Sequence, residues 1–131
     1  MANPNIVAVT NIVGGNLGFN LSATATDTLA TVAADKIVKI NRITVANVDG
    51  TSDATFDLFV DGLTTAGATG FAGTGADATV YLAKTVNVPA DSTLVVVDSP
   101  IYLMEGDILK GGASAAGDLD LFVSYEVIDD A

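Results

Sequence analysis

Apolar and polar residues alternate with a period of two along much of this chain, which is the repeat of a β-strand with one buried face. The alternation is clearest at residues 54–60 and again at residues 119–127. Weaker versions of the pattern predict further strands at residues 5–13, 24–32, 36–47, 78–88, 93–97 and 108–113. No segment carries the repeat of an amphipathic helix. The pattern therefore predicts an all-β fold.

Short runs of glycine, proline, aspartate and asparagine separate the predicted strands and indicate tight turns. Such runs lie, among other places, at residues 14–16, 49–50, 89–91, 99–100 and 111–112. Within residues 36–47 the apolar positions change parity after Ile40, so we expect a β-bulge near Asn41 and Arg42. Short strands at this spacing are typical of an antiparallel β-sandwich or barrel.

The 131 residues fit one domain, in which we expect two parts. Residues 1–34 are predicted to form an extended N-terminal segment with strand character that serves as an interaction arm. Residues 35–131 are predicted to form the β-sandwich core, with a glycine-rich loop at residues 62–76. Loops of this length in a compact domain are usually functional or disordered. Two interpretations stay open: a contact loop anchored by Phe71, or a hairpin extension with no contact role.

Several apolar side chains are predicted to lie where the protein's own core does not cover them. Phe59 and Phe122 fall on the outward parity of their strands, so each needs cover from a loop, another subunit or a partner. The apolar residues of the N-terminal segment raise the same expectation. The predicted partner-contact residues are Ile6, Val7, Val9, Ile12, Phe59, Phe71 and Phe122.

Composition narrows the chemistry. The chain has no cysteine and no histidine, which excludes disulfides, thiolate metal sites, cysteine nucleophiles and the usual general base. Sixteen acidic residues against five basic ones give a net charge of −11, which repels nucleic acid and anionic lipid. No apolar run is long enough to span a membrane, and the N-terminus lacks the basic region of a signal peptide. We therefore expect neither a nucleic-acid partner nor a membrane.

Carboxylates are the abundant reactive groups. Asp49 and Asp53, and likewise Glu105 and Asp107, place two acids a few residues apart, as a calcium site or an acid–base pair would require. Turn capping explains both pairs without an ion, because each contains a glycine where a tight turn is expected. We expect no metal, no cofactor and no enzyme activity. Asp49 and Asp53 are the candidates if calcium is bound.

Three stretches, read together, resemble small virion structural proteins of tailed bacteriophages, including cyanophages. They are residues 43–57, residues 88–94 continuing to 99–107, and residues 113–120. The resemblance covers residues 36–128. It implies a β-sandwich of jelly-roll type that decorates or cements the phage head or forms part of the tail, with no catalytic residues.

The resemblance and the composition together predict a capsid cement or decoration protein. It would sit on the capsid surface of the virion, bound to the major capsid protein and to itself as a homotrimer. A cysteine-free chain suits synthesis in a reducing host cytoplasm. Two alternatives are a tail adaptor, fibre or receptor-binding protein of the phage, and a cellular glycan-binding or adhesin β-sandwich.

Overall fold

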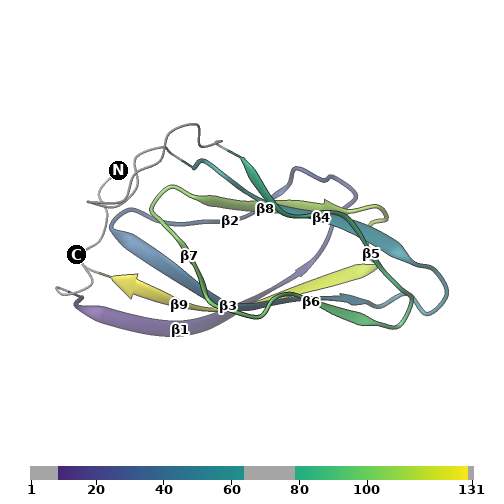
Figure 1. Cartoon of the computed structure of the whole chain (residues 1–131), viewed down its shortest axis with the longest axis horizontal. Helices are drawn as coiled ribbons and strands as arrows, with labels where there is room; N and C mark the ends of the chain where they lie inside the picture. The colour runs from purple at the N-terminus through teal and green to yellow at the C-terminus, as the bar shows by residue number, and fades with distance from the viewer. Residues whose placement is uncertain (1–8, 64–78, 130–131) are drawn as a thin grey trace.

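The computed structural model describes residues 9–63 and 79–129 and has two sheets packed face to face (Figure 1). Within these residues the regular structure consists of nine β-strands, and every strand pair is antiparallel. The described part of the chain contains no helix that is long and apolar enough to cross a membrane. The predicted antiparallel β-sandwich is confirmed.

One sheet, here called the β9 sheet, has the order β1-β9-β3-β6, with the short β7 pairing with β3 beside β6. Its strands are β1 (Asn11–Asn20), β9 (Leu119–Asp129), β3 (Lys36–Asn47), β6 (Thr93–Val97) and β7 (Ile101–Leu103). The other sheet, here called the β4 sheet, has the order β2-β8-β4-β5. Its strands are β2 (Thr28–Thr31), β8 (Ile108–Ala113), β4 (Ala54–Asp61) and β5 (Val80–Val88).

The strand pairs are nested along the chain. β4 pairs with β5, β3 with β6 and β7, β2 with β8, and β1 with β9. The chain thus follows one long hairpin whose paired arms pass alternately through the two layers. Two further pairings, β3 with β9 and β4 with β8, complete the sheets.

The core lies between the sheets and follows the predicted alternation. Phe56 and Leu58 of β4 are almost fully buried against Ile43, Val45 and Leu121 of the opposite sheet. These inward side chains alternate with more exposed neighbours along β3, β4 and β9, apart from the buried Phe59 on β4, as one buried face requires. The predicted bulge is also confirmed, because the register between β3 and β9 shifts between Ile40 and Arg42.

Two predicted turns are wrong, at residues 14–16 and 111–112, which lie inside β1 and β8. In β1, a Cβ added at Gly15 would lie 2.8 Å from the hydroxyl oxygen of Tyr125 on β9. In β8, a Cβ at Gly111 would lie 2.3 Å from the carbonyl oxygen of Asp57 on β4. These glycines therefore permit neighbouring strands to approach closely inside a sheet. Glycine also occurs in turns, so the sequence alone does not distinguish the two roles.

The N-terminal part also differs from the prediction. The first described strand spans residues 11–20 instead of 5–13, and β2 is shorter than the predicted 24–32. β1 and β2 are the outer strands of the two sheets, so residue 35 is not a boundary between an arm and a core. The described part of the N-terminal segment belongs to the sandwich itself.

Candidate interaction surface

The solvent side of the β9 sheet gathers exposed apolar and basic side chains. Residues that face each other across an antiparallel pair share one side of the sheet. Phe122 pairs with Thr44, which pairs with Val95, and Lys39 pairs with Tyr102. Here the outer face means Lys39, Arg42, Val95, Tyr102 and Phe122. Its three apolar members are exposed: Val95 to 45 %, Tyr102 to 57 % and Phe122 to 48 %.

The outer face also differs in charge from the rest of the molecule. Lys36 pairs with Asp129 at 2.8 Å and Lys110 with Asp61 at 2.9 Å. The Nζ of Lys84 lies 4.5 Å from the centre of the Tyr81 ring. Among described residues, Lys39 and Arg42 make no ion pair within 4.0 Å. Three described cations therefore lack an ion pair. Lys84 contacts the Tyr81 ring, whereas Lys39 and Arg42 lie on the outer face of a protein whose net charge is −11.

Acidic side chains share this side of the β9 sheet. Glu126 faces Lys39 across the β3–β9 pair, and Asp120 lies further along β9. The two negative charges of Glu126 and Asp120 balance the two positive charges of Lys39 and Arg42 on this side of the sheet. Other acidic side chains lie in loops and strand ends, such as Asp49, Asp53, Asp91 and Asp118. An approaching molecule, including an acidic one, meets less repulsion at the outer face than at those loops.

Of the two predicted aromatic contacts, one is exposed and one is covered. Phe122 lies open on the outer face, so contact with a partner stays a prediction for this residue. Phe59 on β4 is only 5 % exposed, because the Tyr81 ring on β5 lies with its centroid 4.9 Å from the Phe59 ring. The prediction that Phe59 contacts a partner is therefore wrong, since its cover comes from the neighbouring strand.

The N-terminal and loop candidates are only partly described. Ile12 is exposed on β1, and Val9 lies half-buried just before that strand. Ile6, Val7 and Phe71 lie outside the described residues, and so does most of the glycine-rich loop.

The carboxylates of Asp49 and Asp53 are engaged in holding loops. Asp49 Oδ1 accepts hydrogen bonds from the backbone N and the Oγ1 of Thr51, both at 2.9 Å. These bonds lower the pKa of Asp49 below its usual value. Asp53 accepts from the backbone N of Ala90 at 3.1 Å and from Asn87 Nδ2 at 3.2 Å. No cluster of three acidic residues suited to a metal occurs among the described residues. The geometry is that of turn capping.

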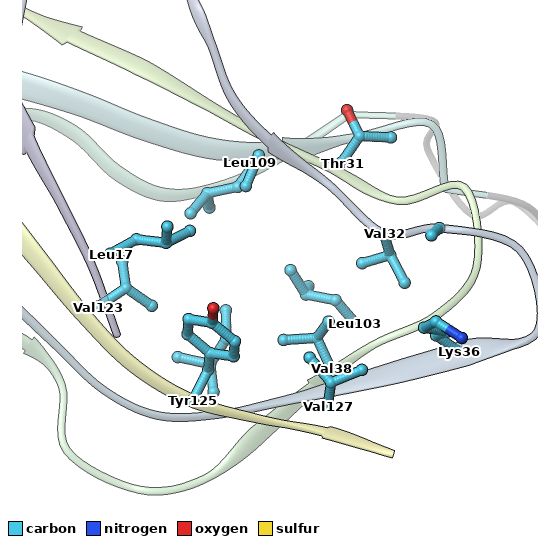
Figure 2. A pocket seen from close by; sticks show the side chains of 13 residues that line it. Leu17, Thr31, Val32, Lys36, Val38, Leu103, Leu109, Val123, Tyr125 and Val127 are labelled. Atoms are coloured by element: carbon cyan, nitrogen blue, oxygen red, sulfur yellow. The ribbon is translucent and has the colours of Figure 1, made fainter. Parts of the chain in front are cut away.

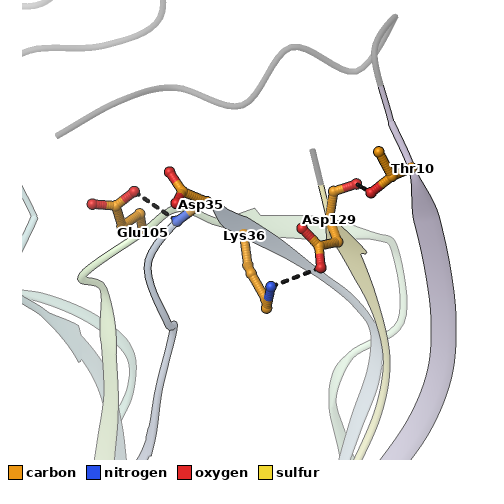
Figure 3. Close-up of polar contacts among 5 residues, drawn as sticks. All are labelled: Thr10, Asp35, Lys36, Glu105 and Asp129. Atoms are coloured by element: carbon orange, nitrogen blue, oxygen red, sulfur yellow. Dashed lines mark hydrogen bonds and ion pairs between the residues drawn. The ribbon is translucent and has the colours of Figure 1, made fainter. Parts of the chain in front are cut away.

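Glu105 and Asp107 likewise serve the backbone. Glu105 Oε2 accepts from the backbone N of Asp35, at 2.9 Å, which joins the loop before β3 to the loop before β8 (Figure 3). Asp107 is buried and its Oδ2 accepts from the backbone N of Met104 at 2.8 Å. Burial raises the pKa of Asp107, and the Met104 hydrogen bond opposes that rise. Glu105 thus bonds to the loop before β3, whereas Asp107 bonds within its own loop.

The end of the sandwich where β3 begins and β9 finishes is closed by polar contacts. The ion pair between Lys36 and Asp129 links β3 to β9, and Figure 3 shows it between the two strands. The backbone N and the Oγ1 of Thr10 both donate to the carbonyl oxygen of Asp129, at 2.8 and 3.1 Å. The segment just before β1 is thereby tied to the last residue of β9.

An apolar cavity of about 210 Å³ lies between the sheets near this end, and no sequence pattern predicted it. Its walls come from six strands and the loop that joins β2 to β3, with side chains pointing inward from both layers (Figure 2). Leu17, Val32, Leu103 and Val127 are among its apolar lining residues. The Tyr125 hydroxyl lies on the cavity side of its ring (Figure 2), and Lys36 at the margin is held by its ion pair. The lining contains no carboxylate.

No family model matches the chain, and neither a curated protein nor a solved structure matches it. The functional argument therefore rests on the sequence and on the surfaces described above.

Proposed function

We propose that this protein is a structural component of a tailed-bacteriophage virion, a cement protein that binds the capsid surface and holds neighbouring major capsid subunits together. The observation that carries the proposal is the outer face, where Phe122, Tyr102 and Val95 are exposed beside two cations without an ion pair. Aromatic residues and arginine are enriched in protein interfaces, whereas most other charged residues are depleted there. A sheet face of this composition is suited to binding another protein.

The nested strand pairs support the same proposal. A chain wound as one long hairpin through two sheets, with orders β1-β9-β3-β6 and β2-β8-β4-β5, supports a sandwich of jelly-roll type, in which β6 and β7 would share one strand position. Jelly rolls occur in viral capsid proteins, and also in lectins and cupins. The resemblance of residues 43–57, 88–107 and 113–120 to phage virion proteins favours the virion among these uses.

The described surface is suited to binding a partner through shape complementarity. The four candidate carboxylates each accept hydrogen bonds from loop atoms, so they stabilise the loops of the sandwich. A protein on an icosahedral shell occupies symmetric positions, and a homotrimer matches a threefold axis. The proposal therefore includes self-association as a trimer on the shell, after synthesis in the host cytoplasm.

The test is binding to capsids purified from the phage that encodes the chain and depleted of this protein. The double variant Phe122→Ala, Tyr102→Ala should bind these heads at least about tenfold more weakly, because buried aromatic residues are common interface hot spots. Val80→Ala is the matched control, since Val80 is comparably exposed but lies on the β4 sheet. Equal binding by the double variant and the wild type would contradict a role of the outer face.

Cryo-electron microscopy of the complete virion locates the protein directly. Density on the capsid lattice would support the cement role. Density confined to the tail would contradict it and favour a tail adaptor or fibre. Absence from the particle, combined with binding to host glycan, would favour the cellular alternative.

A further inference from the structure

β1 has one free edge among the described residues, because it pairs with β9 on one side and ends the order of its sheet. A free edge exposes backbone donors and acceptors that pair readily with another strand. Proteins usually protect such edges with charges, proline, bulges or short strands. β1 has ten residues, no charged side chain and no proline, and its register with β9 runs from Asn11 to Asn20 without a shift.

The other edges of the described sheets carry the protection that β1 lacks. β2 has only four residues and a register shift. β5 carries Lys84, shows register shifts against β4, and has Thr85 in the left-handed region with φ 51°. β6 and β7 are short strands separated by Ser99 and Pro100. β1 is therefore the edge of the described sandwich that is open to another strand.

The backbone groups on the free edge belong to the even-numbered residues. The backbone N of Leu21 donates to the carbonyl oxygen of Leu119 at 2.9 Å, one step beyond the pair of Asn20 with Asp120. Because hydrogen-bonded pairs alternate along an antiparallel ladder, the odd-numbered residues of β1 bond to β9. The groups that face the free edge are those of Ile12, Gly14, Asn16, Gly18 and Asn20.

We propose that two copies of this chain pair through this edge, with β1 antiparallel to the second copy's β1 and a two-fold axis at Asn16. An axis placed on a residue keeps matching faces of the two sheets together, because paired residues then have the same parity. With the axis at Asn16, all five edge-facing residues find a partner. Gly14 lies opposite the second copy's Gly18, and Ile12 opposite its Asn20.

The inward side chains of β1 also match in this register. Val13 lies opposite the second copy's Phe19, and Leu17 opposite its Gly15. Val13 is 53 % exposed in the single chain and Leu17, which lines the cavity, is 36 % exposed. Pairing covers these side chains and extends the two cores toward each other, which adds hydrophobic stabilisation to the backbone hydrogen bonds.

Charge favours this edge as the place where two copies meet. Each copy carries a net charge of −11, so most approaches bring acidic groups together. β1 is the longest described strand without a charged residue. A second copy therefore pairs more favourably with the β1 edge than with any other edge in the described fold.

The test measures the mass of the full chain by sedimentation and light scattering over a wide concentration range. Gly14→Pro removes an edge-facing N–H and leaves the β9 hydrogen bonds intact, and a Cβ at Gly14 meets no atom within 4 Å. Gly14→Ala is the matched control, because it adds the Cβ and keeps the N–H. Two symmetry-related hydrogen bonds are lost in Gly14→Pro, so we expect pairing to weaken on the order of 30-fold, while Gly14→Ala pairs like the wild type.

A wild-type protein with an even number of chains supports the proposal, including a hexamer if trimers join in pairs. A species that stays monomeric or trimeric overturns it, as does an assembly whose size Gly14→Pro leaves unchanged.

Hydrogen exchange of the wild type provides a readout that does not depend on a variant. The amides of residues 12, 14, 16 and 18 should slow on association, whereas those of residues 13, 15, 17 and 19 are protected already. Fast exchange of the even-numbered amides at all concentrations would also overturn the proposal. Head binding is measured separately, so either proposal can fail without the other.

Discussion

Asn47, at the end of β3, is a buried amide that ties together three parts of the loop end of the sandwich. Its side chain is 4 % exposed. Nδ2 donates to the carbonyl oxygens of Ser52 and Val88, each at 2.9 Å, and Oδ1 accepts from the backbone N of Asp49 at 2.9 Å. Replacing Asn47 with alanine leaves two carbonyl oxygens and one amide without these partners, in a place with little room for water.

The expected magnitude follows from the three hydrogen bonds. A hydrogen bond contributes about 1 kcal/mol net to stability, so Asn47→Ala should lower the free energy of unfolding by about 3 kcal/mol. An unfolding entropy of about 2.1 cal/mol/K per residue, over this chain, gives about 0.28 kcal/mol/K. The melting temperature should therefore fall by about 10 °C.

Urea unfolding followed by circular dichroism, together with scanning calorimetry, measures both quantities. Asn87→Ala is the control, because Asn87 is exposed and its amide makes one hydrogen bond of 3.2 Å, to Asp53. The control should lose less than about 1 kcal/mol. If Asn47→Ala unfolds within about 0.5 kcal/mol of the wild type, the claim that this amide holds the loops together is refuted.

Three further predictions concern close packing and titration. Gly111→Ala should destabilise the fold by more than about 2 kcal/mol, seen as a lower urea midpoint, because its Cβ would lie 2.3 Å from the Asp57 carbonyl oxygen. Hydrogen bonds from Lys110 and other neighbours of Asp61 lower the pKa of Asp61 to about 2. The contribution of ionised Asp61 to stability should therefore be lost as the pH falls from 3.8 through 2. Asp61→Asn should flatten this acid limb of a curve of unfolding free energy against pH. Burial raises the pKa of Asp107, so the folded protein holds this proton more tightly than the unfolded protein does. The free energy of unfolding should therefore fall as the pH rises above 3.8. Asp107→Asn should remove this fall, measured as the urea midpoint across pH.

Where strands carry clear alternation and sharp turn signals, the sequence predicted them well. The bounds of β3, β6 and β8 match the predictions, and the bulge after Ile40 was visible as a change of parity. These features are local, because the repeat of two and the turn residues both act over a few positions. β1 failed the same reasoning, since Gly14 and Gly15 suggest a turn unless the Tyr125 ring on a distant strand is known.

The candidate surface was only half predictable for a related reason. Parity placed Phe122 outward, and its exposure agrees. Parity also placed Phe59 outward, but it could not show that Tyr81 of the neighbouring strand covers that ring. Lys39 and Arg42 share the outer face only because the bulge between them shifts the repeat by one residue. The cavity depends on how the two layers separate near β2, which no local pattern encodes.

The nested pairing has a consequence for how the molecule is made. Thr10 and Asp129 contact each other across 119 positions, and β9 lies between β1 and β3 in the finished sheet. A ribosome therefore delivers β1 and β3 long before the strand that must separate them. Contacts so distant in sequence close slowly, typically in milliseconds to seconds for all-β domains. During translation the early strands have to avoid pairing with each other or with neighbouring nascent chains, and the uncharged β1 is the segment most exposed to that error.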